Sequence, residues 1–62
     1  MNNAEIAKET IEQFKKVQRY MLMAKEENAT KTYALIKEDY VSLKALLNII
    51  GVNLSELDII KE

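Results

Sequence analysis

A chain of 62 residues forms one domain at most, and its formal net charge of −1, from 9 basic and 10 acidic side chains, lacks the basic excess typical of nucleic-acid binders. The chain contains no cysteine and no histidine, which excludes disulfides, thiolate metal sites, and the commonest zinc ligand and general base. We therefore predict a protein that is not an enzyme and that uses no metal or cofactor.

The first predicted element is a helix over about residues 3–27. At 100° per residue its apolar side chains fall on one broad face, opposite a face of Glu, Lys and Arg side chains. This face is wider than a coiled-coil seam, so we expect it to contact more than one neighbour. The face comprises Ile6, Ala7, Ile11, Phe14, Val17, Tyr20, Met21, Leu22 and Ala24.

A turn is predicted at about residues 28–31, within the segment KEENATKT, which has no large apolar side chain. Asn and Thr favour caps and turns, and Thr30 or Thr32 is the expected N-cap of the next helix. The alternative is one unbroken helix of about 48 residues, roughly 70 Å long at 1.5 Å per residue. We favour the hairpin because eight consecutive positions without a core contact would interrupt a long zipper.

The second predicted helix covers about residues 32–50. Its apolar side chains follow the 3-4-3-4-3 spacing of the seam in left-handed helix packing, and further apolar residues widen the stripe on one side. Three repeats are too few for a long coiled coil but suit a helical bundle. The seam consists of Tyr33, Ile36, Tyr40, Leu43, Leu47 and Ile50.

The segment after this helix predicts a helix end followed by a new start. Gly51, the only glycine, fits the left-handed position that ends a helix. Asn53 can cap a short third helix over about residues 54–61, with Glu56 as its capping-box partner and Leu57 in a hydrophobic staple with Val52. Leu54, Leu57 and Ile60 would then face the core.

The same segment resembles the end of Cro/C1-type helix-turn-helix repressor domains. The resemblance covers Ser42 to Leu57 and consists of a leucine-rich helix, a Gly-Val-Asn-Leu turn and a final Glu-Leu. It implies a similar local packing, since the family contacts DNA through a recognition helix further upstream, and residues 1–41 have no such helix-turn-helix pattern. The residues that carry it are Leu43, Leu46, Ile50, Gly51, Val52, Leu54, Glu56 and Leu57.

Two polar side chains fall within the apolar arcs of the predicted helices. Asp39 is either a buried carboxylate that fixes a partner or, as we favour, an acid at the edge of an interface that reaches water or a basic group. Gln18 either selects register or oligomeric state, or bonds to a neighbouring backbone group at the edge of the hairpin. The sequence supports these two interpretations of Gln18 about equally.

Several other side chains suggest binding, and each has a simpler structural explanation. Tyr33 and Tyr40 could stack on nucleic-acid bases or bind proline-rich peptides, but we expect them in the core with their hydroxyls at the bundle surface. Met23 points to the charged face and is expected to be exposed. A small basic cluster is expected to be a solvated, charge-paired face, and it comprises Lys15, Lys16 and Arg19.

The sequence thus predicts an all-α protein: an antiparallel helical hairpin with a short third C-terminal helix, dimerising into a helical bundle. A disulfide-free chain of this length is marginal alone, so we expect a homodimer that acts as a protein–protein interaction, adaptor or regulatory module. The alternative is a small transcription-accessory or DNA-binding regulator of phage or mobile-element type. The residues expected in the core or interface are Ile11, Phe14, Val17, Met21, Ile36, Tyr40, Leu43, Leu46, Leu47 and Ile50, and those expected in the structural turn are Gly51, Asn53 and Leu57.

The expected setting of this module is the bacterial or phage-infected cytoplasm. No apolar run approaches the roughly 20 residues that span a bilayer, and the N-terminal residues lack the apolar stretch of a signal peptide. The abundance of Lys, Ile and Asn suits an AT-rich bacterium or its phage. We expect no nucleic acid and no membrane among its partners, and an unknown protein partner beside a second copy of the chain.

Overall fold

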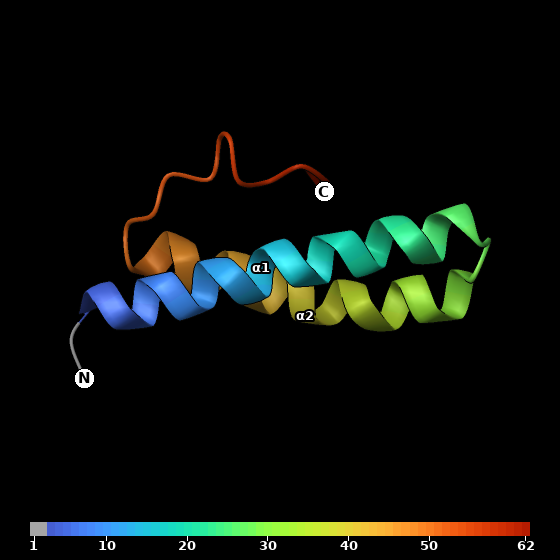
Figure 1. The fold of residues 1–62 in the computed structure, drawn as a ribbon, viewed down its shortest axis with the longest axis horizontal. Coiled ribbons are helices and arrows are strands. Elements are labelled where there is room, and N and C mark those ends of the chain that lie inside the picture. Colours follow the sequence, from blue (N-terminus) through green and yellow to red (C-terminus); the bar gives the residue numbers. More distant parts are fainter. Residues whose placement is uncertain (1–2) are drawn as a thin grey trace.

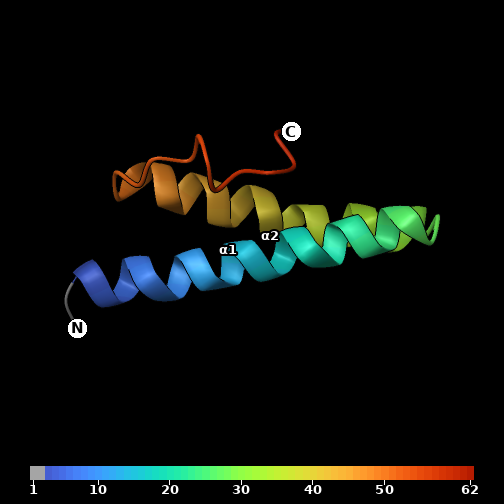
Figure 2. The ribbon, with the colours of Figure 1, turned by 45° about the horizontal axis from the view of Figure 1, so that its top comes forward.

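The computed structural model describes residues 3–62 and shows two antiparallel helices packed as a hairpin, α1 (Asn3–Glu26) and α2 (Thr30–Ile49). The predicted all-α hairpin is confirmed, and the alternative of one unbroken helix is wrong (Figure 1). Residues 50–62, here called the C-terminal segment, turn back and run along one side of the hairpin (Figure 2). They end above the middle of the two helices.

The core lies along the seam between α1 and α2. Buried apolar side chains of both helices meet there, and the rings of Phe14 and Tyr40 stack with their centroids 5.4 Å apart. Their spacing along each helix follows the 3.6-residue period, which places them on facing sides of the two helices. The fully packed cluster consists of Phe14, Val17, Met21, Tyr40 and Leu47.

Each helix ends in the same type of backbone turn. After α1, the amide of Ala29 donates to the carbonyl of Ala24 at 2.8 Å, with Asn28 at a φ of +59°. After α2, the amide of Val52 donates to the carbonyl of Leu47 at 2.9 Å, with Gly51 at a φ of +82°. In both motifs an amide reaches back five residues across a residue in the left-handed conformation, which gives a carbonyl of the last turn a partner.

The predicted N-cap of α2 is wrong. The helix begins at Thr30, so neither Thr30 nor Thr32 is its cap; the N-cap is Ala29, which offers no side-chain hydrogen bond. The Ala29 carbonyl accepts from the amide of Tyr33 at 2.8 Å. The tight turn after α1 therefore sets where α2 begins, and a capping side chain is not required.

The predicted third helix over residues 54–61 does not form. The amide of Ser55 donates to the Asn53 side chain at 2.9 Å, as expected for a cap, and Asp58 donates to the Leu54 carbonyl at 2.9 Å. Only this single turn follows. The next amides, which would continue a helix, donate to side chains elsewhere in the fold: those of Ile59 and Ile60 to Gln18 Oε1 and that of Lys61 to Asp58 Oδ1.

Candidate functional site

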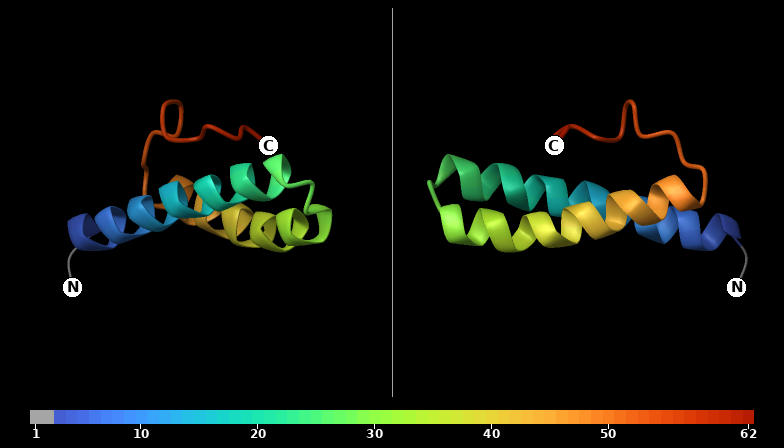
Figure 3. Two further views of the ribbon diagram at one scale, coloured as in Figure 1. Left: turned by 45° about the vertical axis from the view of Figure 1, so that its right-hand side comes forward. Right: turned by 180° about the vertical axis from the view of Figure 1, so that it is seen from behind.

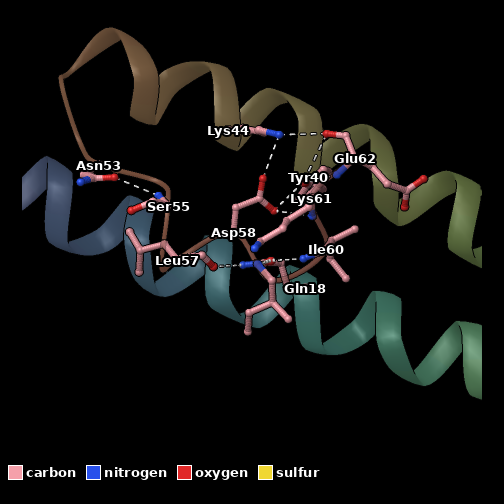
Figure 4. Close-up of polar contacts among 11 residues, drawn as sticks. Gln18, Tyr40, Lys44, Asn53, Ser55, Leu57, Asp58, Ile60, Lys61 and Glu62 are labelled. Carbon is pink, nitrogen blue, oxygen red and sulfur yellow. Dashed lines mark hydrogen bonds and ion pairs between the residues drawn. The ribbon is translucent and has the colours of Figure 1, made fainter.

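The C-terminal segment is held on the hairpin by Gln18, a side chain of α1 that is 1% exposed. Its Nε2 donates to the carbonyl of Leu57 at 2.8 Å, and its Oε1 accepts the amides of Ile59 and Ile60 at 2.6 and 3.1 Å (Figure 4). One amide side chain thus satisfies three backbone groups about 40 positions away in the sequence. Of the two interpretations of Gln18, the structure supports the bond to backbone groups.

A second anchor comes from Asp58, which projects from the C-terminal segment onto α2. Its carboxylate accepts hydrogen bonds from the buried Tyr40 hydroxyl at 2.6 Å and the Lys61 amide at 2.8 Å, and it forms an ion pair with Lys44 at 2.8 Å (Figure 4). The Tyr40 hydroxyl in turn accepts the amide of Glu62 at 3.1 Å. The role of Asp58 was not predicted from the sequence, although an acid between Leu57 and two isoleucines is a visible signal.

The electrostatics of this second anchor favour the charged carboxylate. Burial opposes ionisation of Asp58, but the hydrogen bonds from Lys44, Tyr40 and the Lys61 amide outweigh it and hold the pKa of Asp58 below its ordinary value. Burial, together with the hydrogen bond to Asp58, raises the pKa of the Tyr40 hydroxyl. At neutral pH the anchor is therefore an ionised carboxylate bound by a neutral hydroxyl and an ammonium group.

The end of the chain adds an exposed set of contacts. The Tyr33 hydroxyl and the Lys37 ammonium group both bind the Glu62 side chain, and Lys44 donates to the Glu62 carbonyl at 2.9 Å. The hydrogen bond from Tyr33 and the contact with Lys37 lower the pKa of the Glu62 carboxyl. The two tyrosines expected in the core therefore differ: Tyr40 is buried and binds Asp58, whereas Tyr33 is half-buried and binds the chain end.

The opposite side of the hairpin is left uncovered by the C-terminal segment (Figure 3). An open groove of about 440 Å³ runs there between the helices, with Gln13, Lys16 and Tyr20 on one wall and Asp39 and Ser42 on the other. Helical spacing adds five further positions to these two walls. We call the whole set the back face: Ile6, Glu9, Gln13, Lys16 and Tyr20 of α1, and Leu35, Asp39, Ser42, Leu46 and Ile49 of α2.

Large apolar side chains of the back face are exposed to solvent. The exposed fraction is 46% for Tyr20, 67% for Leu35, 38% for Leu46 and 80% for Ile49. Asp39 is also exposed, so the alternative of a buried carboxylate is wrong. This face therefore carries exposed apolar surface, and the exposed Leu22 and Ile59 line a second groove beside the C-terminal segment.

The residues singled out from the sequence divide into three groups. Five lie fully in the core, namely Phe14, Val17, Met21, Tyr40 and Leu47. Half-buried against that core are Ile11, Ile36, Leu43, Ile50 and Leu57. Leu46 lies outside it on the back face, Gly51 and Asn53 form the bend into the C-terminal segment, and Met23, Lys15, Lys16 and Arg19 are exposed.

Two findings describe what residues 3–62 lack. No helix among them is long and apolar enough to cross a membrane. No three Asp or Glu side chains in this part of the chain are grouped so that they could hold a metal ion.

Comparison of the chain with protein-family models, with curated proteins and with solved structures gives no match.

Proposed function

We propose that this protein is a small protein–protein interaction module that works by binding rather than catalysis, and that it associates through its back face into a homo-oligomeric helical bundle. The observation that carries the proposal is the row of exposed apolar side chains on the side that the C-terminal segment leaves open. Several large exposed apolar side chains gathered on one side of a small protein favour a binding surface there. The chain also has no disulfide to offset its small core.

The two sides of the hairpin support this assignment. On one side, the C-terminal segment packs Val52, Leu54, Leu57 and Ile60 against the core. On the other side, no part of residues 3–62 covers the equivalent groove. A second hairpin placed on that groove would complete a four-helix arrangement in which apolar stripes of both helices are buried.

Sedimentation equilibrium at micromolar concentration tests the proposal. The wild-type chain is expected to sediment as a dimer, and Leu35→Glu is expected to sediment as a folded monomer because a charge replaces an apolar contact of the back face. Val41→Glu is the matched control, because Val41 is also exposed, at 52%, but lies outside the back face. A wild-type monomer, or equal loss of the dimer in both variants, would overturn the proposal.

The alternative, a DNA-binding regulator, draws on the resemblance of Ser42 to Leu57 alone. The helices of the described residues form one antiparallel hairpin, and the segment after Gly51 makes a single turn. The proposal therefore includes no nucleic-acid partner. A mobility-shift titration with duplex DNA at moderate salt provides the test, and sequence-specific retention would favour the alternative.

A further inference from the structure

At four of five levels, the two walls of the back face carry residues that suit one another, either both apolar, both polar or oppositely charged. The stacked rings of Phe14 and Tyr40 fix the register of the two helices. Gln13 and Ser42, within two positions of those rings, therefore lie at nearly the same level on opposite walls of the groove. Because the helices are antiparallel, each step toward the turn adds a residue number on α1 and subtracts one on α2. Three steps from Gln13 and Ser42 lie Lys16 and Asp39, which also share the groove.

Seven positions from Gln13 and Ser42, in either direction along the helices, the residues at matching levels are apolar. Toward the turn they are Tyr20 and Leu35, and toward the open end they are Ile6 and Ile49. Each wall therefore has apolar side chains at its two ends and polar side chains in the middle. The two opposite charges, Lys16 and Asp39, lie at the same level. Glu9, near the level of Leu46, is the one position that does not follow this match.

Among residues 3–62, neither Lys16 nor Asp39 forms an ion pair. The ion pairs among the described residues join Lys37 with Glu62 and Lys44 with Asp58, and Lys16 takes part in neither. The Lys16 ammonium group lies instead over the Tyr20 ring, 5.8 Å from its centroid, at the edge of the back face. Asp39 is exposed across the groove, so both charges are free to meet a partner.

From this pattern we infer that the occupant of the back face is a second copy of the chain, stacked with its turn at the same end as the first. This inference rests on the proposed function. A two-fold axis parallel to the helices places α1 of each copy over α2 of the other at unchanged level. The matching residues then become contacts: Tyr20 with Leu35, Lys16 with Asp39, and Gln13 with Ser42, each between copies and each made twice.

The competing arrangement has the turns at opposite ends. Its two-fold axis crosses the helices, so each helix packs against its own copy in reverse, with Ser42 against Ser42 and Gln13 against Gln13 at the centre. That arrangement brings Lys16 near Glu9, and it brings Asp39 near the apolar Leu46. In that arrangement the residues that match across the two walls, such as Lys16 and Asp39, do not contact each other between copies. We therefore favour the same-end arrangement.

Cysteine cross-linking distinguishes the two arrangements, because the natural chain has no cysteine. In the same-end dimer, position 13 of one copy contacts position 42 of the other. We therefore expect a disulfide dimer when an equimolar mixture of Gln13→Cys and Ser42→Cys is oxidised, and none when either variant is oxidised alone. In the opposite-end dimer, each variant alone cross-links with itself. Arg19→Cys, an exposed position away from the back face, reports random collision.

A charge swap gives an independent readout. Lys16→Glu alone and Asp39→Lys alone each place like charges in contact, and we expect each to weaken the dimer roughly tenfold. A mixture of the two variants restores opposite charges at both contacts and should form the heterodimer at near wild-type affinity. Lys15→Glu makes the same charge change one residue away, off the back face, and should leave the dimer unchanged.

The outcomes separate this inference from the proposed function. Disulfides in the mixture alone, together with the charge rescue, support the same-end dimer. A dimer by sedimentation that self-cross-links at Ser42→Cys, or that fails to cross-link in the mixture, overturns the inference but leaves the proposed function in place. A wild-type monomer by sedimentation overturns both.

Discussion

The hairpin and the C-terminal segment are held by different kinds of interaction, although both belong to one small fold. Between α1 and α2 the contacts are apolar side chains repeated at helical spacing, with Phe14 and Tyr40 stacked at the centre. The C-terminal segment also packs apolar side chains, but its backbone is bound by two buried polar side chains, Gln18 and Asp58. Repeated apolar contacts tolerate small shifts, whereas a segment without a regular helix needs specific hydrogen bonds to hold one path.

Truncating a core side chain between α1 and α2 should lower the stability of the fold more than any other change considered. Leu47 is fully buried in the core, so Leu47→Ala is expected to lower the free energy of unfolding by about 2–5 kcal/mol. Leu43→Ala should cost less, because Leu43 is only half-buried. Thermal melts followed by circular dichroism measure both, with the exposed Val41→Ala as the control that should stay near wild type. An unchanged melt for Leu47→Ala would show that the seam between α1 and α2 is not the core.

Releasing the C-terminal segment should have a smaller and more local effect. Gln18→Met keeps the volume of the side chain but removes three hydrogen bonds to residues 57–60, so we expect a loss of about 2 kcal/mol. Amide hydrogen exchange should show faster exchange at Ile59 and Ile60 while the centres of α1 and α2 stay protected. Lys15→Met, a change on the same helix that is exposed and off the back face, should alter neither amide. Uniform deprotection of both helices would mean that the two regions unfold as one unit.

The difference between the two regions also explains what could be predicted from the sequence. The hairpin, its turn near Asn28 and the inward positions of Leu54, Leu57 and Ile60 follow from periodicity and turn chemistry. The third helix was predicted from local signals at Asn53 and Leu57, and the cap bond to Ser55 does form. Local signals could not show that Gln18, about 40 residues away, takes the amides that would have continued the helix.

The dependence of stability on pH should distinguish the anchor at Asp58, which titrates, from the anchor at Gln18, which does not. The pKa of Asp58 is lower in the folded chain than its ordinary value, so its contribution is present above that ordinary value, about pH 4, and is lost as the pH falls through the folded pKa. We expect Asp58→Asn to cost about 1–2 kcal/mol at pH 7 and to flatten the fall in stability below about pH 4. Denaturant titrations from pH 2 to pH 7 measure this. Gln18→Met, which removes no titrating group, should keep the wild-type acid slope, and an unchanged slope in Asp58→Asn would contradict the assignment.

The smallest expected effects concern the two helix ends, which share one backbone motif but use different residues in the left-handed position. At Gly51, which has a φ of +82°, an added Cβ would meet no other atom within 4 Å. Gly51→Ala should therefore cost only the strain of that φ, roughly 1 kcal/mol. At Asn28, where φ is +59°, asparagine already tolerates the conformation, so Asn28→Gly should change the stability by less than about 0.5 kcal/mol. Chemical denaturation of the two variants side by side measures the contrast. A cost at Gly51 well above 1 kcal/mol would mean that the bend into the C-terminal segment is held more tightly than the turn between the helices, through the anchors that lie beyond it.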